Sequence, residues 1–126
     1  MKLGHCVIDD DVNAIAEQMR TADVIAFATP IYYYEMSGQL KTLLDRANAL
    51  YTSDYAFRDI YMLTAAAEDA PGVPDRAVSG LTGWIDCSEH ARLAGTAFAG
   101  GVDAPGGVKQ RSHPALEQAR ALGKSV

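Results

Sequence analysis

Apolar and polar positions follow two periods along this chain, and together they predict strands that alternate with helices. Strands are expected where apolar residues run continuously, over 23–28, 59–64 and 93–99. Helices are expected where apolar residues recur every three or four positions, over 12–19, 37–51, 75–91 and 113–123. This order predicts the α/β class, an open parallel sheet with helices on both faces.

The ends of the predicted helices carry residues that suit them. Asp9–Asp11 precede the first helix, where carboxylates can cap free N–H groups and are favoured by the helix dipole. Ser37 is a predicted N-cap, and Pro114 suits the first turn of the last helix. Gly123 is a natural end for that helix.

In open parallel sheets, ligands bind beyond the carboxyl ends of the strands. Three predicted loops meet at that edge, over 29–37, 65–75 and 100–112. Each of them runs from a strand end to the start of a helix, where backbone N–H groups are free to meet an acceptor. The sequence therefore places any ligand site among these loops.

The first loop carries the most specific chemistry. Pro30 is expected to end the strand because proline lacks a backbone donor. Tyr32–Tyr34 offer flat apolar faces with polar tips, which suit a planar aromatic ligand, and Met36 can fill the gap beside a ring. Tyrosine is also enriched at protein interfaces, so the same residues fit a dimer contact equally well.

The other two loops are less specific. Ala65–Ala67 would let a ligand approach the backbone closely, and they also fit ordinary packing at a strand end. Glu68 and Asp69 are expected to be solvated or to cap a helix. Four glycines between residues 100 and 107 could cradle a phosphate, but their spacing matches no phosphate fingerprint and predicts a mobile loop instead.

Composition and charge narrow the class of protein. A length of 126 residues predicts one domain. The net charge is −5 and the 11 lysines and arginines form no cluster, so nucleic acid is not an expected partner. No apolar run is long enough to span a membrane, and residues 1–5 lack the apolar core of a signal peptide, so a cytoplasmic protein is expected.

The cysteines and histidines do not form a catalytic or metal-binding set. Cys6 and Cys87 are expected to be free thiols, as is usual for cytoplasmic proteins. His5 beside Cys6 supplies two adjacent ligands where a structural zinc site has four, so no metal is expected. His90 and His113 are far apart and no serine lies in a nucleophile elbow, so no catalytic residue is predicted.

Four segments resemble a known family. TPIYYYEMSGQLKTLLDR, from Thr29 to Arg46, resembles the flavin loop and following helix of the flavodoxin-like NAD(P)H-dependent FMN reductases, including their iron–sulfur flavoprotein branch. HCVIDDDVNAIAEQMRTADVIAFA is similar to the preceding Cys-Val-acidic segment and third strand of that family. RDIYMLTAAAED is similar to its fourth strand and loop, and HPALEQARALGKSV to its closing helix. The resemblance covers nearly the whole chain.

The resemblance implies a flavodoxin-like sheet that binds FMN non-covalently, in dimers with the flavin near the subunit boundary. NAD(P)H would reduce the flavin and a small-molecule or quinone-like acceptor would reoxidise it, which requires no side-chain acid or base. Residues 30–37 would wrap the ring and ribityl chain, and Ala66 and Ala67 would border the ring. The implied cofactor-binding residues are Thr29, Pro30, Ile31, Tyr32, Tyr33, Tyr34, Glu35, Met36, Ser37, Ala66 and Ala67.

The chain departs from the family pattern at its start. The family's first strand, its glycine- and serine-bearing phosphate loop, the next helix and the second strand have no counterpart, nor has the cysteine cluster of the iron–sulfur branch. We therefore expect a single flavodoxin-like domain over 1–126, incomplete at its N-terminus. Residues 23–28 would then form a sheet edge, and a homodimer, a higher oligomer or a separate chain carrying the absent unit is expected to cover it.

The resemblance to the family and the departure at the start of the chain together leave two functions open, and they belong to different classes. One is an FMN-binding, NAD(P)H-dependent oxidoreductase, with a site that a partner chain completes where necessary. The other is an FMN-free, non-enzymatic flavodoxin-like subunit that acts through oligomerisation. The second is open because a phosphate held by amides at a helix start is a large share of FMN recognition.

Overall fold

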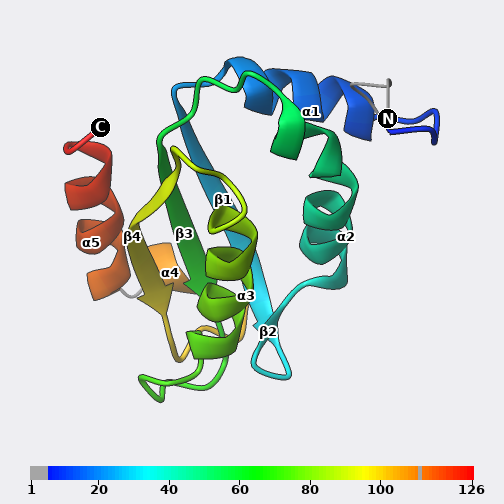
Figure 1. Cartoon of the computed structure of the whole chain (residues 1–126). Coiled ribbons are helices and arrows are strands. Elements are labelled where there is room, and N and C mark those ends of the chain that lie inside the picture. Colours follow the sequence, from blue (N-terminus) through cyan, green and yellow to red (C-terminus); the bar gives the residue numbers. More distant parts are fainter. Residues whose placement is uncertain (1–5, 111) are drawn as a thin grey trace.

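The computed structural model describes residues 6–110 and 112–126, which form a four-stranded sheet flanked by helices (Figure 1). His5, considered above with Cys6 as a metal ligand, lies outside the described residues. The strands are β1 (Val24–Tyr32), β2 (Glu35–Met36), β3 (Asp59–Ala65) and β4 (Arg92–Ala99). The helices are α1 (Val12–Thr21), α2 (Gly38–Arg46), the 3-10 helix η1 (Ala47–Thr52), α3 (Asp75–Ile85), α4 (Gly107–Gln110) and α5 (Pro114–Gly123).

The sheet has the order β2-β1-β3-β4, and its three long strands are parallel. The β1–β3 register runs from Val24 opposite Asp59 to Pro30 opposite Ala65. Ala65 is in turn opposite Ala99 of β4. The α/β class and the parallel arrangement are thus confirmed, and the three strands end at one common edge of the sheet.

Two details of the first strand differ from the sequence prediction. Pro30 does not end the strand, because β1 continues to Tyr32. Proline is tolerated there because β1 is an edge strand at that point, where a missing donor interrupts no second ladder. A fourth strand, β2, turns back antiparallel with Ile31 opposite Met36, and it is too short to produce a periodic pattern in the sequence.

Two predicted helices are longer than the observed ones. The helix expected over 37–51 ends at Arg46, and the chain continues as the tighter helix η1. The helix expected over 75–91 ends at Ile85, and Cys87 and Ser88 then make i to i−3 hydrogen bonds that close a turn. The short helix α4 lies within the loop predicted over 100–112, and its four residues are too few to show a helical period.

The predicted N-cap at Ser37 and the predicted end of α5 are confirmed, and the cap expected among Asp9–Asp11 is made by Asp10. The Ser37 hydroxyl accepts a hydrogen bond from the Leu40 N–H at 3.3 Å, and α5 ends at Gly123 as expected. At the start of α1, the Asp10 carboxylate accepts from the Val12 N–H at 3.0 Å, whereas Asp11 makes no side-chain cap. The negative charge therefore lies where the helix dipole favours it.

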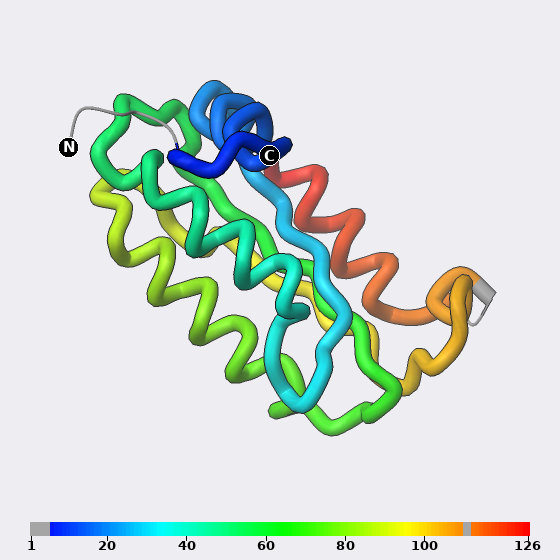
Figure 2. The backbone as a smooth tube through the Cα atoms, turned by 90° about the vertical axis from the view of Figure 1, so that its right-hand side faces the viewer, coloured from blue at the N-terminus to red at the C-terminus, as the bar shows by residue number. Residues whose placement is uncertain are grey.

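The main core lies between the sheet and the layer formed by α2 and α3, and α5 lies on the opposite face of the sheet (Figure 2). Ile60 and Met62 of β3 are fully buried, as is Leu81 of α3. The Phe27 ring meets Trp84 edge-on, with centroids 6.0 Å apart. This core holds the inner faces of β1 and β3 in place.

The opposite face of the sheet is only partly covered. Helix α5 packs on β4, where a β-carbon at Gly95 would overlap the Leu122 side chain. On β1 the outward residues Ala26, Ala28 and Pro30 are exposed. Among the described residues no strand pairs with positions 24–30 of β1 on the side away from β3, so β1 presents both a bare face and a bare edge.

A histidine caps α5, and this cap can be tested. The His113 Nδ1 atom accepts from the Ala115 N–H at 3.1 Å, and Nε2 lies 2.9 Å from the Gly100 carbonyl, to which it can donate. We expect His113→Ala to lower the free energy of unfolding in urea by about 1–2 kcal/mol, and His113→Asn to recover most of the cap. Substituting the exposed His90 by Ala is the control, and an equal effect of the two alanine variants would contradict this role.

Candidate functional site

A strained hairpin lies at the carboxyl edge of the sheet. A two-residue turn, Tyr33–Tyr34, joins β1 to β2, with φ angles of 51° and 67°. Positive φ at both positions is characteristic of a type I′ turn, which favours Asn and Gly, and it costs a bulky residue about 1–2 kcal/mol. Tyr33 is 97% exposed, so no packing explains its presence at this position. Such strain marks the turn as a candidate functional element.

The base of the hairpin is firmly held. The Thr29 hydroxyl accepts from the Ser37 N–H at 2.9 Å and donates to the Pro30 carbonyl at 2.9 Å. Met36 is buried in the core, and its Cε atom lies 3.3 Å from where a β-carbon would sit on Gly80 of α3. The loop 29–37 is therefore an ordered hairpin with a fixed base and a projecting tip.

The loop after β3 lies beside this hairpin because of the β1–β3 register. The Ala66 N–H donates to the Ala99 carbonyl at 3.0 Å, and the Ala66 carbonyl accepts from the Val102 N–H at 2.8 Å. A β-carbon at Gly100 would overlap Asp69, so glycine allows the two loops to approach closely. The loop 65–69 is thus fixed against the end of β4.

One hydrogen bond joins the hairpin tip to this loop. The Tyr34 hydroxyl donates to the Glu68 carboxylate at 2.9 Å, between residues 34 positions apart in the sequence. The hydrogen bond to Glu68 and the charge of that carboxylate raise the pKa of Tyr34, so the phenol stays a neutral donor. Glu68 is exposed as expected, but its bond to Tyr34 is a contact that no local sequence signal indicates.

The structure divides the predicted site residues into a buried base and an exposed rim. Thr29, Met36, Ser37 and Ala66 are buried, and Ile31 is half-buried. The exposed residues are Pro30, Tyr32, Tyr33, Tyr34, Glu35 and Ala67. The exposed tyrosines and Ala67 are placed where a ligand could reach them, whereas Met36 belongs to the core. Contact of any of these residues with flavin stays a prediction.

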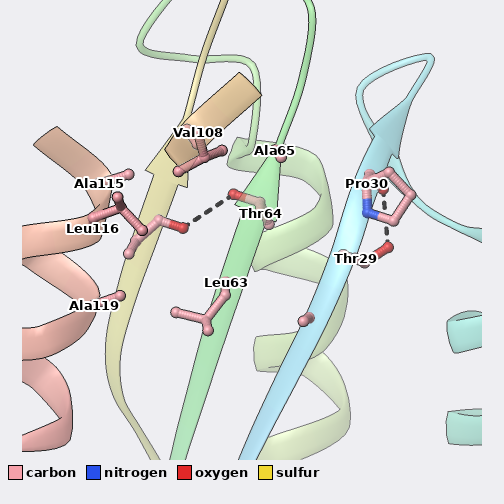
Figure 3. A pocket seen from close by; sticks show the side chains of 12 residues that line it. Thr29, Pro30, Leu63, Thr64, Ala65, Val108, Ala115, Leu116 and Ala119 are labelled. Atoms are coloured by element: carbon pink, nitrogen blue, oxygen red, sulfur yellow. Dashed lines mark hydrogen bonds between the residues drawn. The ribbon is translucent and has the colours of Figure 1, made fainter. Parts of the chain in front are cut away.

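An apolar cavity of 440 Å³ borders the site on the face of the sheet that α5 partly covers (Figure 3). Its floor is formed by small and aliphatic residues of the three long strands, and one wall is formed by α4 and α5. Thr29 and Pro30 belong both to this lining and to the hairpin. The other lining residues are Ala28, Leu63, Thr64, Ala65, Ala97, Ala99, Val108, Ala115, Leu116 and Ala119.

Cys6 lies far from this site, beside α2. Its Sγ atom is 3.6 Å from Nη2 of Arg46, which also pairs with Asp10. The Ile8 backbone N–H and the Arg46 guanidinium lower the pKa of the Cys6 thiol. Cys6, which is half-buried, and Cys87, which is exposed, are both free cysteines in the structure.

The described part of the chain offers neither a metal cluster nor a membrane anchor of the helical kind. Within residues 6–110 and 112–126, no group of three His, Cys, Asp or Glu side chains could hold a metal ion. In the same residues, no helix has both the length and the apolar character needed to cross a bilayer.

The arrangement defines the class of protein, a flavodoxin-like α/β domain. A protein from Bacillus subtilis described as Trp repressor binding protein superposes with a TM-score of 0.71 and 21% identity, over 91% of this chain and 71% of its own. An NAD(P)H:quinone oxidoreductase from Methanothermobacter marburgensis superposes with a TM-score of 0.67 and 20% identity, over 96% of this chain and 64% of its own. These likenesses confirm the fold.

Residues 1–108 match the model of the NADPH-dependent FMN reductase family, and the chain belongs to that family. An iron-sulfur flavoprotein of Methanosarcina thermophila is 29% identical over 77% of this chain and 51% of its own. Another, of Methanocaldococcus jannaschii, is 30% identical over 98% of this chain and 66% of its own. The chain therefore spans between about half and two thirds of the length of these relatives.

The hydroxyl of Thr29 provides a test of the hairpin base. We expect Thr29→Val, which keeps the shape but removes the acceptor of the buried Ser37 N–H, to lower the free energy of unfolding by about 1–3 kcal/mol. Thr29→Ser keeps the hydroxyl and should lose less. Urea unfolding measures both, and hydrogen exchange at the Ser37 amide should rise only in the valine variant. Equal stability of the two variants would show that this bond does not hold the hairpin.

Proposed function

We propose that this chain binds FMN and acts as an NAD(P)H-dependent oxidoreductase. Its membership of the FMN reductase family supports this function. The structural observation that carries the proposal is the exposed aromatic hairpin at the carboxyl edge of the sheet, which lies next to a loop of small residues. In open parallel sheets this edge is where ligands bind.

The residues at this edge fit a flavin ring. Tyr32 and Tyr33 expose 62% and 97% of their surface, and their flat faces suit an aromatic ring system. Ala66 and Ala67 on the facing loop lack long side chains that would fill the space. We infer that residues 30–37 wrap the ring and the ribityl chain and that the two alanines border the ring.

FMN held by residues 29–37, Ala66 and Ala67 would supply the redox chemistry, the transfer of reducing equivalents from NAD(P)H to a small-molecule or quinone-like acceptor. The chain's own residues bind and orient the ring and shield one side of it from water. The proposed reaction requires no side-chain acid or base, which agrees with the absence of a catalytic set in the sequence.

The proposal includes a second copy of the chain that covers β1. Strands of parallel sheets are usually buried on both faces, whereas β1 exposes Ala26, Ala28 and Pro30. No strand within residues 6–110 and 112–126 pairs with the edge of β1 away from β3 over 24–30, so that edge also offers backbone groups to a partner. A homodimer or higher oligomer would bury both features, and a partner could complete the flavin site. A cytoplasmic location belongs to the same proposal.

The alternative is an FMN-free subunit that has no enzymatic activity and acts through association. The bare face and edge of β1 favour it, because these features would persist whether or not flavin binds. The two functions predict opposite results with FMN. Quenching of flavin fluorescence at micromolar protein supports the oxidoreductase, and no binding at millimolar FMN supports the alternative.

Replacing Tyr33 tests the flavin loop. We expect Tyr33→Ala to weaken FMN binding about three- to tenfold by removing an exposed aromatic face, while leaving the fold intact. Fluorescence quenching measures the affinity, and circular dichroism checks the fold. The control is Tyr51→Ala, which removes a tyrosine that is 60% exposed on η1. If Tyr33→Ala binds FMN as tightly as the parent, the loop is wrongly assigned.

The bare strand predicts self-association. Light scattering at micromolar concentration should give a mass of at least twice 13.5 kDa. Ala28→Lys places a charge on the exposed face of β1 and should shift the protein toward monomer, whereas Ala121→Lys on the exposed side of α5 should not. A parent protein that scatters as one 13.5 kDa species would overturn the dimer proposal.

A further inference from the structure

The tip of the hairpin has few contacts of its own. Below it, Met36 is buried and the Ser37 N–H is bonded to Thr29, so the base cannot shift easily. At the tip, Tyr33 is almost fully exposed and both turn residues have positive φ angles. Packing therefore does not fix the Tyr33 side chain.

The loop that faces the tip is held from the other side. Ala66 is bonded through both its N–H and its carbonyl to the segment that follows β4. Asp69 lies against Gly100, where only glycine leaves enough room. Glu68 lies between these two attachments, so its carboxylate projects from a fixed support.

The hydrogen bond between Tyr34 and Glu68 connects the exposed turn of the hairpin to the fixed loop 65–69. Among the interactions of the described residues it is the side-chain hydrogen bond that joins the turn to loop 65–69. The neighbouring Tyr33 hydroxyl makes no hydrogen bond within the described residues. The bond from Tyr34 is thus a direct side-chain link between the turn and the loop that carries Ala66 and Ala67.

We propose that Tyr34 and Glu68 are positioning residues, whose hydrogen bond sets the width of the slot for the flavin ring before the ring arrives. The inference rests on the proposed function for its ligand, but the bond and its effect on the turn can be measured without flavin. A turn that is already held in its bound position loses less conformational freedom when the ligand binds. Removing the Tyr34–Glu68 hydrogen bond should therefore lower the affinity for flavin.

The central experiment compares Tyr34→Phe and Glu68→Gln with the control Tyr51→Phe, at an exposed tyrosine of η1 outside the proposed site. Tyr34→Phe removes the donor and keeps the ring, whereas Glu68→Gln keeps an acceptor oxygen without the charge. We expect Tyr34→Phe to speed amide exchange of residues 32–35 in the flavin-free protein and to weaken flavin binding about three- to tenfold. Tyr51→Phe should change neither quantity, and Glu68→Gln should retain more affinity than Glu68→Ala.

A second comparison identifies the part of the ligand that the bond affects. Riboflavin carries the ring and ribityl chain of FMN without the phosphate. If the bond sets the width of the slot for the ring, Tyr34→Phe should weaken the binding of riboflavin and of FMN by the same factor. A loss of affinity for FMN alone would show that the bond does not act on the flavin ring.

The outcomes separate this inference from the proposed function. A parent protein that binds neither FMN nor riboflavin overturns the proposed function and the ring-positioning role together. A parent that binds flavin, with unchanged exchange and unchanged affinity in Tyr34→Phe, overturns the positioning role alone. Faster exchange with an equal loss for both flavins supports it.

Discussion

The parallel register between β1 and β3 is the constraint on which the rest of the site depends. It places Pro30 beside Ala65, so the hairpin and the loop after β3 leave the sheet at the same level. Neither segment alone forms a pocket. The ladder of backbone hydrogen bonds between β1 and β3 brings the two segments side by side, so that Tyr34 comes within reach of Glu68.

The same strand links the fold to association. Its inner residues Ile25 and Phe27 are buried against α2 and α3, which ties β1 firmly to the core. Its outer residues Ala26 and Ala28 are small and exposed, and its free edge is unpaired among the described residues. Because one face of β1 is packed firmly in the core, the strand can remain ordered while its other face is uncovered. The fold is therefore compatible with the proposed oligomer.

The hairpin turn shows a conflict between local preference and position. A type I′ turn is most stable with Asn and Gly, yet this chain has Tyr33 and Tyr34 at positive φ. The local cost is offset elsewhere, by Met36 in the core and by the Thr29 hydroxyl. Departures from local preference concentrate at functional sites. The strain in the turn therefore supports the proposal that the hairpin binds a ligand.

The sequence by itself determined the order of the three long strands and the four longer helices, the α/β class, the N-cap at Ser37 and the end of α5 at Gly123, because these depend on periodicity and on local hydrogen bonding. The tertiary structure decided that β1 runs through Pro30, because tolerance of proline depends on whether a neighbouring strand needs its donor. It also decided the bond between Tyr34 and Glu68, which lie 34 positions apart and meet only through the strand register. Contacts of that kind depend on the whole sheet, and no local pattern of residues contains them.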